Sequence, residues 1–324
     1  MPSVDIDDIK GTTQRALRAH GANESVAATM ADAVAWAEAR NNRVCGLYYV
    51  ESYCRQLRSG RVGGTVGPRV SRPRPGTVLV DAANGFAQPA FLAALPMLVA
   101  ATRECGVSSL AISRAHTCTA LGWFTERLAA QDLIGIGMTN ASPIVAPPGG
   151  RRRVIGTNPI AFAAPDGAGG VALAFDQSTT QVALGRITMA EAAGESIPED
   201  WALDAEGRPT TDPKEALKGS LASAGGHKGW GIGVMVELLA AGMTGGRLSR
   251  DVKPLKASEG EPHDLGQYFL AIDPADAFAQ RLAGLVSEVE EDGTGRLPGR
   301  GRVSAECVEV PDPLWSTITI LAGT

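Results

Sequence analysis

The sequence predicts an α/β fold, because strand-like and helix-like segments alternate through the middle of the chain. Residues 108–113 and 133–139 are apolar runs typical of buried strands, and residues 121–131 between them have helical spacing. A strand–helix–strand unit favours parallel pairing, and it gathers ligand-binding loops at the strand ends. Of the 324 residues, 44% are apolar and 20% are charged, which is typical of a globular protein of about two domains.

The other elements follow from periodicity and turn residues. Residues 60–75 are rich in Gly, Pro and Arg without periodicity, so we expect a loop or an arm that contacts a partner. Expected helices lie within residues 4–20, 25–38, 48–57, 89–103, 231–241 and 275–291. Expected strands lie at residues 77–81, 160–164, 171–175, 267–273 and 315–321.

Composition excludes several classes of protein. A net charge of −5 offers no broad basic face, so nucleic acid is not an expected partner. Five scattered cysteines without a CxxC motif argue against a disulfide framework and a zinc site, and no other metal site is expected. The acidic start and the lack of a long apolar run predict a cytoplasmic protein with no membrane contact.

Standard nucleotide-binding motifs are missing, since no GxGxxG or P-loop spacing is present. The run GGHKG either forms a glycine turn that caps a helix or places His227 and Lys228 at a helix N-terminus that binds phosphate. His116 is either a structural residue at a strand end or a site residue. Asp176 is either a cap or a site residue, and Thr157 lies in a polar turn.

Taken together, these residues resemble the type-2 malate/L-lactate dehydrogenase family. The resemblance lies in HTCTALGWFTERLAAQDLIGIGMTNASP from His116, GTNPIAFAAP, FDQST, IPEDWALDAEGRPTTDP and GGHKGWGIGVMVELLAAGMTG, in family order over about residues 80–273. It implies NAD(P)-dependent oxidoreduction of small 2-hydroxy/2-oxo acids or cyclic 2-imino acids. It also implies a homodimer and a non-Rossmann fold, with a mixed sheet and two interlocked lobes. We assign residues 1–113 plus 264–324 to a helical substrate lobe and residues 114–263 to a dinucleotide-binding lobe.

The same resemblance implies the residues that bind NADPH or NADH. They are His116, Thr117, Cys118, Thr119, Ala120, Thr139, Asn140, Ser142, Asp176, Gln177, Ser178, His227, Lys228, Gly299 and Arg300. Thr157 falls where the family contacts substrate. Arg300 stands where the family has an acid. The basic run at residues 151–153 could read a 2′-phosphate or be a solvated face, so the choice between the two cofactors stays open.

The chain departs from the family where the substrate should react. Val44 and Cys45 stand in place of the family's Ser and proton-donating His, and Tyr49 stands in place of an Arg that would hold a carboxylate. Where imine-reducing members have Arg-Gly-Asp, this chain has Leu-Gly followed by Arg186. The catalytic candidates are therefore Cys45, Tyr49 and His116. The substrate-binding candidates are Arg40, Val44, Thr157 and Arg186, with Arg43 as a further cation.

Loss of the acid favours one chemistry. Reduction of a ketone needs a general acid, worth about 10²–10⁴-fold, whereas hydride addition to an iminium gives a neutral amine without a proton in that step. We therefore expect an NAD(P)H-dependent reductase of a C=N or C=O bond in a small metabolite of a specialised biosynthetic pathway. Two alternatives remain: a 2-oxo acid dehydrogenase with His116, Tyr48 or Tyr49 as the acid, and a non-catalytic dinucleotide-binding protein.

Overall fold

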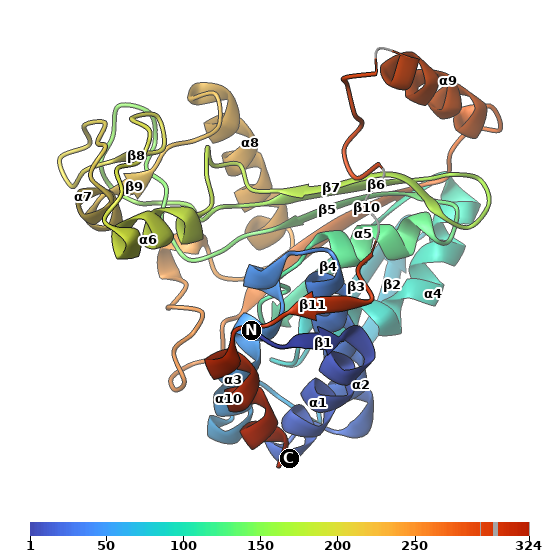
Figure 1. The fold of residues 1–324 in the computed structure, drawn as a ribbon. Helices are drawn as coiled ribbons and strands as arrows, with labels where there is room; N and C mark the ends of the chain where they lie inside the picture. The colour runs from blue at the N-terminus through green and yellow to red at the C-terminus, as the bar shows by residue number, and fades with distance from the viewer. Residues whose placement is uncertain (292, 301–303, 324) are drawn as a thin grey trace.

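The computed structural model describes residues 1–291, 293–300 and 304–323, which form a seven-stranded mixed sheet with helices on both faces (Figure 1). In sheet order the strands are β2 (Arg69–Arg74), β3 (Thr77–Asp81), β4 (Val107–Ala115), β10 (Leu265–Ile272), β5 (Ile134–Thr139), β6 (Ile160–Pro165) and β7 (Val171–Gln177). Strand β2 occupies part of the predicted arm at residues 60–75. That part of the prediction was wrong, because β2 is an edge strand paired with β3 and needs no apolar alternation.

Strand β10 lies between β4 and β5 and is antiparallel to both, with Phe269 opposite Leu110 on one side and Gly137 on the other. The expected parallel pairing of β4 with β5 was therefore wrong. The two strands do run in the same direction, but a segment that follows them by more than a hundred residues fills the gap between them. The one parallel pair in this sheet is β3 with β4.

Each face of the sheet has its own apolar layer. Helices α4 (Ala87–Cys105) and α5 (Gly122–Ala129) cover one face, where the Phe269 ring lies 5.1 Å from Phe91 and 5.2 Å from Phe124 between centroids. On the other face, Tyr268 belongs to a cluster with Met138 and Val236 beneath α8 (His227–Glu237). A π-helical turn, Leu238–Gly242, extends α8 across β10. The alternation of Tyr268 and Phe269 shows that β10 is buried on both faces.

A helical layer formed by the two ends of the chain lies beside the sheet (Figure 1). It contains α1 (Ile6–Ala19), α2 (Glu24–Ala39), α3 (Val50–Ser59) and α10 (Asp312–Ala322), with β1 (Ser3–Asp5) paired to β11 (Cys307–Glu309). The side chains of Asp5 and Asn23 cap α1 and α2 by accepting backbone N–H groups.

The strand predicted over residues 315–321 was wrong, because this segment belongs to α10. Leu314, Ile318 and Leu321 recur at helical spacing and pack into the core of the helical layer. Their burial outweighs the strand preference of the β-branched residues between them.

Two smaller parts complete the molecule. Helices α6 (Leu184–Ala193) and α7 (Pro213–Lys218) enclose an apolar cluster with the short pair β8 (Ala202–Leu203) and β9 (Ser220–Leu221). Helix α9 (Phe278–Glu291) stands apart from this cluster, near the β6–β7 hairpin (Figure 1).

Among the described residues, no helix is both long and apolar enough to cross a bilayer. The division at residues 113/114 and 263/264 remains a prediction, and the sheet takes strands from both sides of it.

Candidate active site

Two short 3₁₀ turns, Arg43–Cys45 and Leu47–Tyr49, bring the altered residues toward the loop that follows β4 and the end of β7. The Asp176 carboxylate is close enough to raise the pKa values of both Cys45 and Cys118. Asp176 also accepts the N–H of Gly122 at 2.9 Å, so it caps α5 from another strand. Val44 is exposed and lies next to Gly185, at the start of α6. Residues from four separate segments thus meet at one place.

Cys45 and Tyr49 are poor proton donors in this environment. Burial is the main cause that raises the pKa of the Cys45 thiol to about 12, and the Asp176 charge adds to it. Burial likewise raises the pKa of the Tyr49 phenol to about 12. The Tyr49 ring stacks on Tyr53 with centroids 5.9 Å apart. With pKa values this far above 7, neither group is an effective general acid at neutral pH.

His116 is a buried histidine whose ring is held by its neighbours. It is 2% exposed, and its Nε2 lies 2.9 Å from Oε1 of Gln56. Burial and the neighbouring His263, whose ring centroid is 4.2 Å away, lower the pKa of His116 well below its usual value. A neutral imidazole already bonded to Gln56 does not suit the role of acid that the oxo-acid alternative gives it.

Each of the expected arginines has a contact, and among the described residues Arg40 is the one of the three that is paired with an acid. Arg40 forms an ion pair with Glu126 at 2.8 Å and lies over the Trp36 ring. Arg186 lies over the Trp201 ring, 5.2 Å from its centroid. Arg43 donates to Asn41. Sequence reasoning missed Lys256, whose Nζ lies 5.2 Å from the centroid of the Tyr49 ring.

The predicted phosphate-binding run begins helix α8. Gly226 caps this helix with φ +64°, and His227 and Lys228 follow it, both exposed. The backbone of Thr179 accepts the N–H of Ala224, so the start of α8 is tied to the turn that contains Asp176, Gln177 and Ser178. Two of the predicted cofactor segments are therefore adjacent.

Thr157 belongs to the same assembly through its backbone. Its carbonyl accepts the backbone N–H and the hydroxyl of Thr179 at 2.9 and 3.0 Å. The next residue, Asn158, donates to Glu237 at 2.8 Å, and Ser249 also bonds to this buried carboxylate. Glu237 is thus the polar anchor that holds the Thr157 turn against α8.

The loop after β5 contains a third predicted cofactor segment. Thr139 donates to the Gly266 carbonyl, Asn140 donates to the Arg247 carbonyl at 2.8 Å, and Ser142 donates to the Lys253 carbonyl. The Oδ1 atom of Asn140 is buried and has no hydrogen-bond partner among the described residues. Such an orphaned acceptor indicates a missing donor, because buried polar atoms are normally paired.

The segment after β4 contributes mainly backbone contacts. The Cys118 carbonyl accepts from Gln88 and from the Thr119 hydroxyl, and Thr119 adopts φ +51°. Thr117 and Ala120 are buried beside them. This tight turn leads directly into α5.

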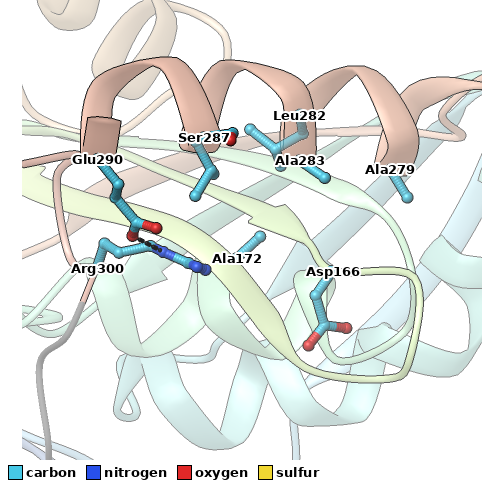
Figure 2. Close-up of a pocket in the computed structure, with 9 residues that line it drawn as sticks. Asp166, Ala172, Ala279, Leu282, Ala283, Ser287, Glu290 and Arg300 are labelled. Carbon is cyan, nitrogen blue, oxygen red and sulfur yellow. Dashed lines mark hydrogen bonds and ion pairs between the residues drawn. The ribbon is translucent and has the colours of Figure 1, made fainter. Parts of the chain in front are cut away.

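Gly299 lies against β7 with φ +75°, and a Cβ there would stand 2.4 Å from the Ala174 carbonyl oxygen. Only glycine fits this approach. Arg300 follows it and forms an ion pair with Glu290 at 2.7 Å (Figure 2). Arg300 and Glu290 line a pocket of about 310 Å³ between α9 and β7. This pocket is separate from the residues around Cys45.

The exposed start of α8 and the unpaired Asn140 acceptor both fit a nicotinamide dinucleotide. His227 and Lys228 would hold phosphate there, since a helix N-terminus supplies N–H donors and a favourable dipole. Asn140, on the neighbouring loop, has an acceptor left for an amide or hydroxyl donor.

Comparison with known proteins gives the same assignment. Residues 4–307 match a family model described as malate/L-lactate dehydrogenase. A Pseudomonas putida protein named Delta(1)-pyrroline-2-carboxylate/Delta(1)-piperideine-2-carboxylate reductase is 39% identical over 304 residues, covering 92% of this chain and 89% of that protein. A (2R)-3-sulfolactate dehydrogenase (NADP(+)) of Chromohalobacter salexigens is 40% identical over 276 residues, 82% of each chain.

A solved structure supports the same assignment. The crystal structure of delta1-piperideine-2-carboxylate reductase from Pseudomonas syringae pv. tomato matches with a TM-score of 0.90 and 34% identity, covering 99% of this chain and 100% of that one. These matches confirm the resemblance, the mixed-sheet fold and the expectation of an oxidoreductase that uses a nicotinamide cofactor. The chain belongs to the malate/L-lactate dehydrogenase family.

Proposed function

We propose that this protein reduces the C=N bond of a small cyclic imine that carries a carboxylate, with hydride from NADPH or NADH. The observation that carries the proposal is Cys45, whose pKa near 12 makes it a poor acid at the place where reduction of a ketone would need one. A bound reduced nicotinamide supplies the hydride. The imine arrives protonated, so the product amine is neutral as it forms.

The chain's own residues then have three tasks. His227 and Lys228 hold the cofactor phosphates, and Asn140 and the Asp176 turn orient its other end. Cys45 and Tyr49 form an apolar wall that keeps water from the iminium carbon. The two imine reductases described above support this substrate class.

A second candidate is reduction of a 2-oxo acid, which the name of the sulfolactate dehydrogenase favours. In that reaction a proton must reach the new alkoxide, and the available groups near Cys45 are Tyr48 and Tyr49. The raised pKa of Tyr49 makes this route the slower one.

We also propose NADPH as the preferred cofactor. Lys228 supplies an exposed cation in a predicted cofactor segment, and the dehydrogenase relative is named for NADP(+). Arg153 supports the choice less, because its guanidinium already donates to the carbonyls of Leu217 and Gly219.

A homodimer is part of the proposal. Ile232, Met235, Leu238 and Met243 form an exposed apolar surface along α8 and the turn that follows it. Such a surface is unusual on a monomer and is typical of a subunit interface. The arm at residues 60–75 stays a predicted contact, and a cytoplasmic location and a biosynthetic role stay predictions.

The test is a spectrophotometric screen for loss of the reduced dinucleotide. The purified protein is offered Delta(1)-pyrroline-2-carboxylate, Delta(1)-piperideine-2-carboxylate and a set of 2-oxo acids, each with NADPH and with NADH. We expect turnover of a cyclic imine with a higher kcat/KM for NADPH. Turnover of 2-oxo acids alone would overturn the imine assignment. Dinucleotide binding without turnover of any substrate would support the non-catalytic alternative.

A further inference from the structure

The segment from Pro254 to Glu261 has little regular structure, yet buried side chains fix its backbone. Arg61 is 2% exposed, and its guanidinium donates to the carbonyls of Pro254 at 3.2 Å, Glu261 at 3.0 Å, and Ala257. A buried guanidinium without acceptors would be costly, so these three bonds hold the segment firmly.

Gln56 fixes the same segment from α3. Its side chain is fully buried, and its amide donates to the carbonyls of Leu255 at 2.7 Å and Ala257 at 2.8 Å. Since both amide protons are used, Oε1 of Gln56 is the acceptor for His116 Nε2. His116 therefore orients Gln56, and Gln56 orients the backbone on both sides of Lys256.

The consequence is a lysine held over the tyrosines of the candidate site. Lys256 Nζ lies 2.9 Å from the centroid of the Tyr48 ring and 5.2 Å from that of Tyr49. Aromatic rings attract an ammonium without neutralising its charge. Lys256 forms no ion pair with any residue that the structure describes, whereas the candidate cation Arg40 is bound to Glu126. The lysine is thus an exposed cation that remains available to an anion.

We propose that Lys256 binds the carboxylate of the substrate. This inference rests on the proposed function, because it names the group that recognises the anionic end of a cyclic imine carboxylate. Tyr49 neighbours both Lys256 and Cys45, so a carboxylate on Nζ would place the imine ring near the wall formed by Tyr49 and Cys45. A lysine binds a carboxylate as a point charge and without the fork of an arginine, so it would accept rings of different size.

The test compares Lys256→Met with Lys256→Arg and with the control Lys253→Met. Lys253 is an exposed lysine immediately before the same segment, so its removal changes the net charge equally. With Delta(1)-pyrroline-2-carboxylate, we expect Lys256→Met to raise KM about 10- to 150-fold, the range for a lost hydrogen bond to a charged group, with little change in kcat. Lys256→Arg should recover most of this loss, and Lys253→Met should match the wild type.

A second substrate isolates the carboxylate. With 1-pyrroline, which lacks that group, wild type and Lys256→Met should have the same KM. An equal rise in KM for both imines, or no rise for either, would overturn the inference while leaving the proposed function intact.

If neither imine is reduced by the wild type, the proposed function fails, and binding decides the inference separately. Calorimetric titration of the dinucleotide-loaded protein with L-proline and with pyrrolidine then measures carboxylate binding directly. Weaker binding of L-proline alone in Lys256→Met supports the inference, and unchanged binding or no binding overturns it.

Discussion

Replacement of Cys45 by alanine tests whether the reaction needs a proton donor from the protein. With a pKa of about 12, conversion of the Cys45 thiol to a thiolate at pH 7 costs about 7 kcal/mol, at about 1.4 kcal/mol for each pKa unit. A donor with that cost contributes little to a transition state. We therefore expect Cys45→Ala to leave the rate of hydride transfer to a cyclic imine within a few-fold of the wild type.

The assay is a single-turnover measurement of dinucleotide oxidation at saturating imine, which separates hydride transfer from product release. Cys105→Ala is the matched control, because Cys105 is an exposed thiol at the end of α4. A loss of about 10²-fold or more in Cys45→Ala, the size of a general-acid effect, would refute the reasoning. Turnover of 2-oxo acids without cyclic imines would refute it as well.

Three further outcomes are expected. Lys228→Ala should weaken dinucleotide binding by about 1.5–3 kcal/mol in a calorimetric titration, and unchanged affinity would contradict its placement at the phosphates. Light scattering at micromolar concentration should give twice the mass of one chain, while Leu238→Asp should shift the protein toward the monomer. His263 has its pKa lowered to about 3 by burial, so the folded state loses stability as pH falls below 6.5; at pH 5 the loss is about 2 kcal/mol. His263→Phe should flatten this dependence in denaturant titrations, and an unchanged slope would contradict it.

Local pattern was enough to predict most of the individual elements. The runs at residues 108–113, 121–131 and 133–139 are β4, α5 and β5 in the structure, because alternation and helical spacing are set by neighbours in sequence. The place of β10 could not be predicted in this way. Its partners are separated from it by more than a hundred residues, and nothing in the segment itself says which two strands it separates.

The candidate site, too, was predictable from the sequence only in part. The turn after β7 and the start of α8 follow from short motifs, and the structure brings them together through Thr179. Lys256 carries no motif, and its position depends on hydrogen bonds from Gln56 and Arg61 that span about 200 residues of sequence. Such contacts are properties of the folded chain, so they lie beyond what spacing alone can indicate.

The central position of β10 governs how the sheet can form during synthesis. Until residue 272 has left the ribosome, β4 and β5 each have an open edge, and the apolar surfaces of α4 and α5 have no Phe269 to pack against. Closure of the sheet requires long-range pairing, which is slow and leaves exposed edges prone to misassembly. Nascent chains shorter than about this length should therefore engage chaperones, and release should coincide with insertion of this one strand.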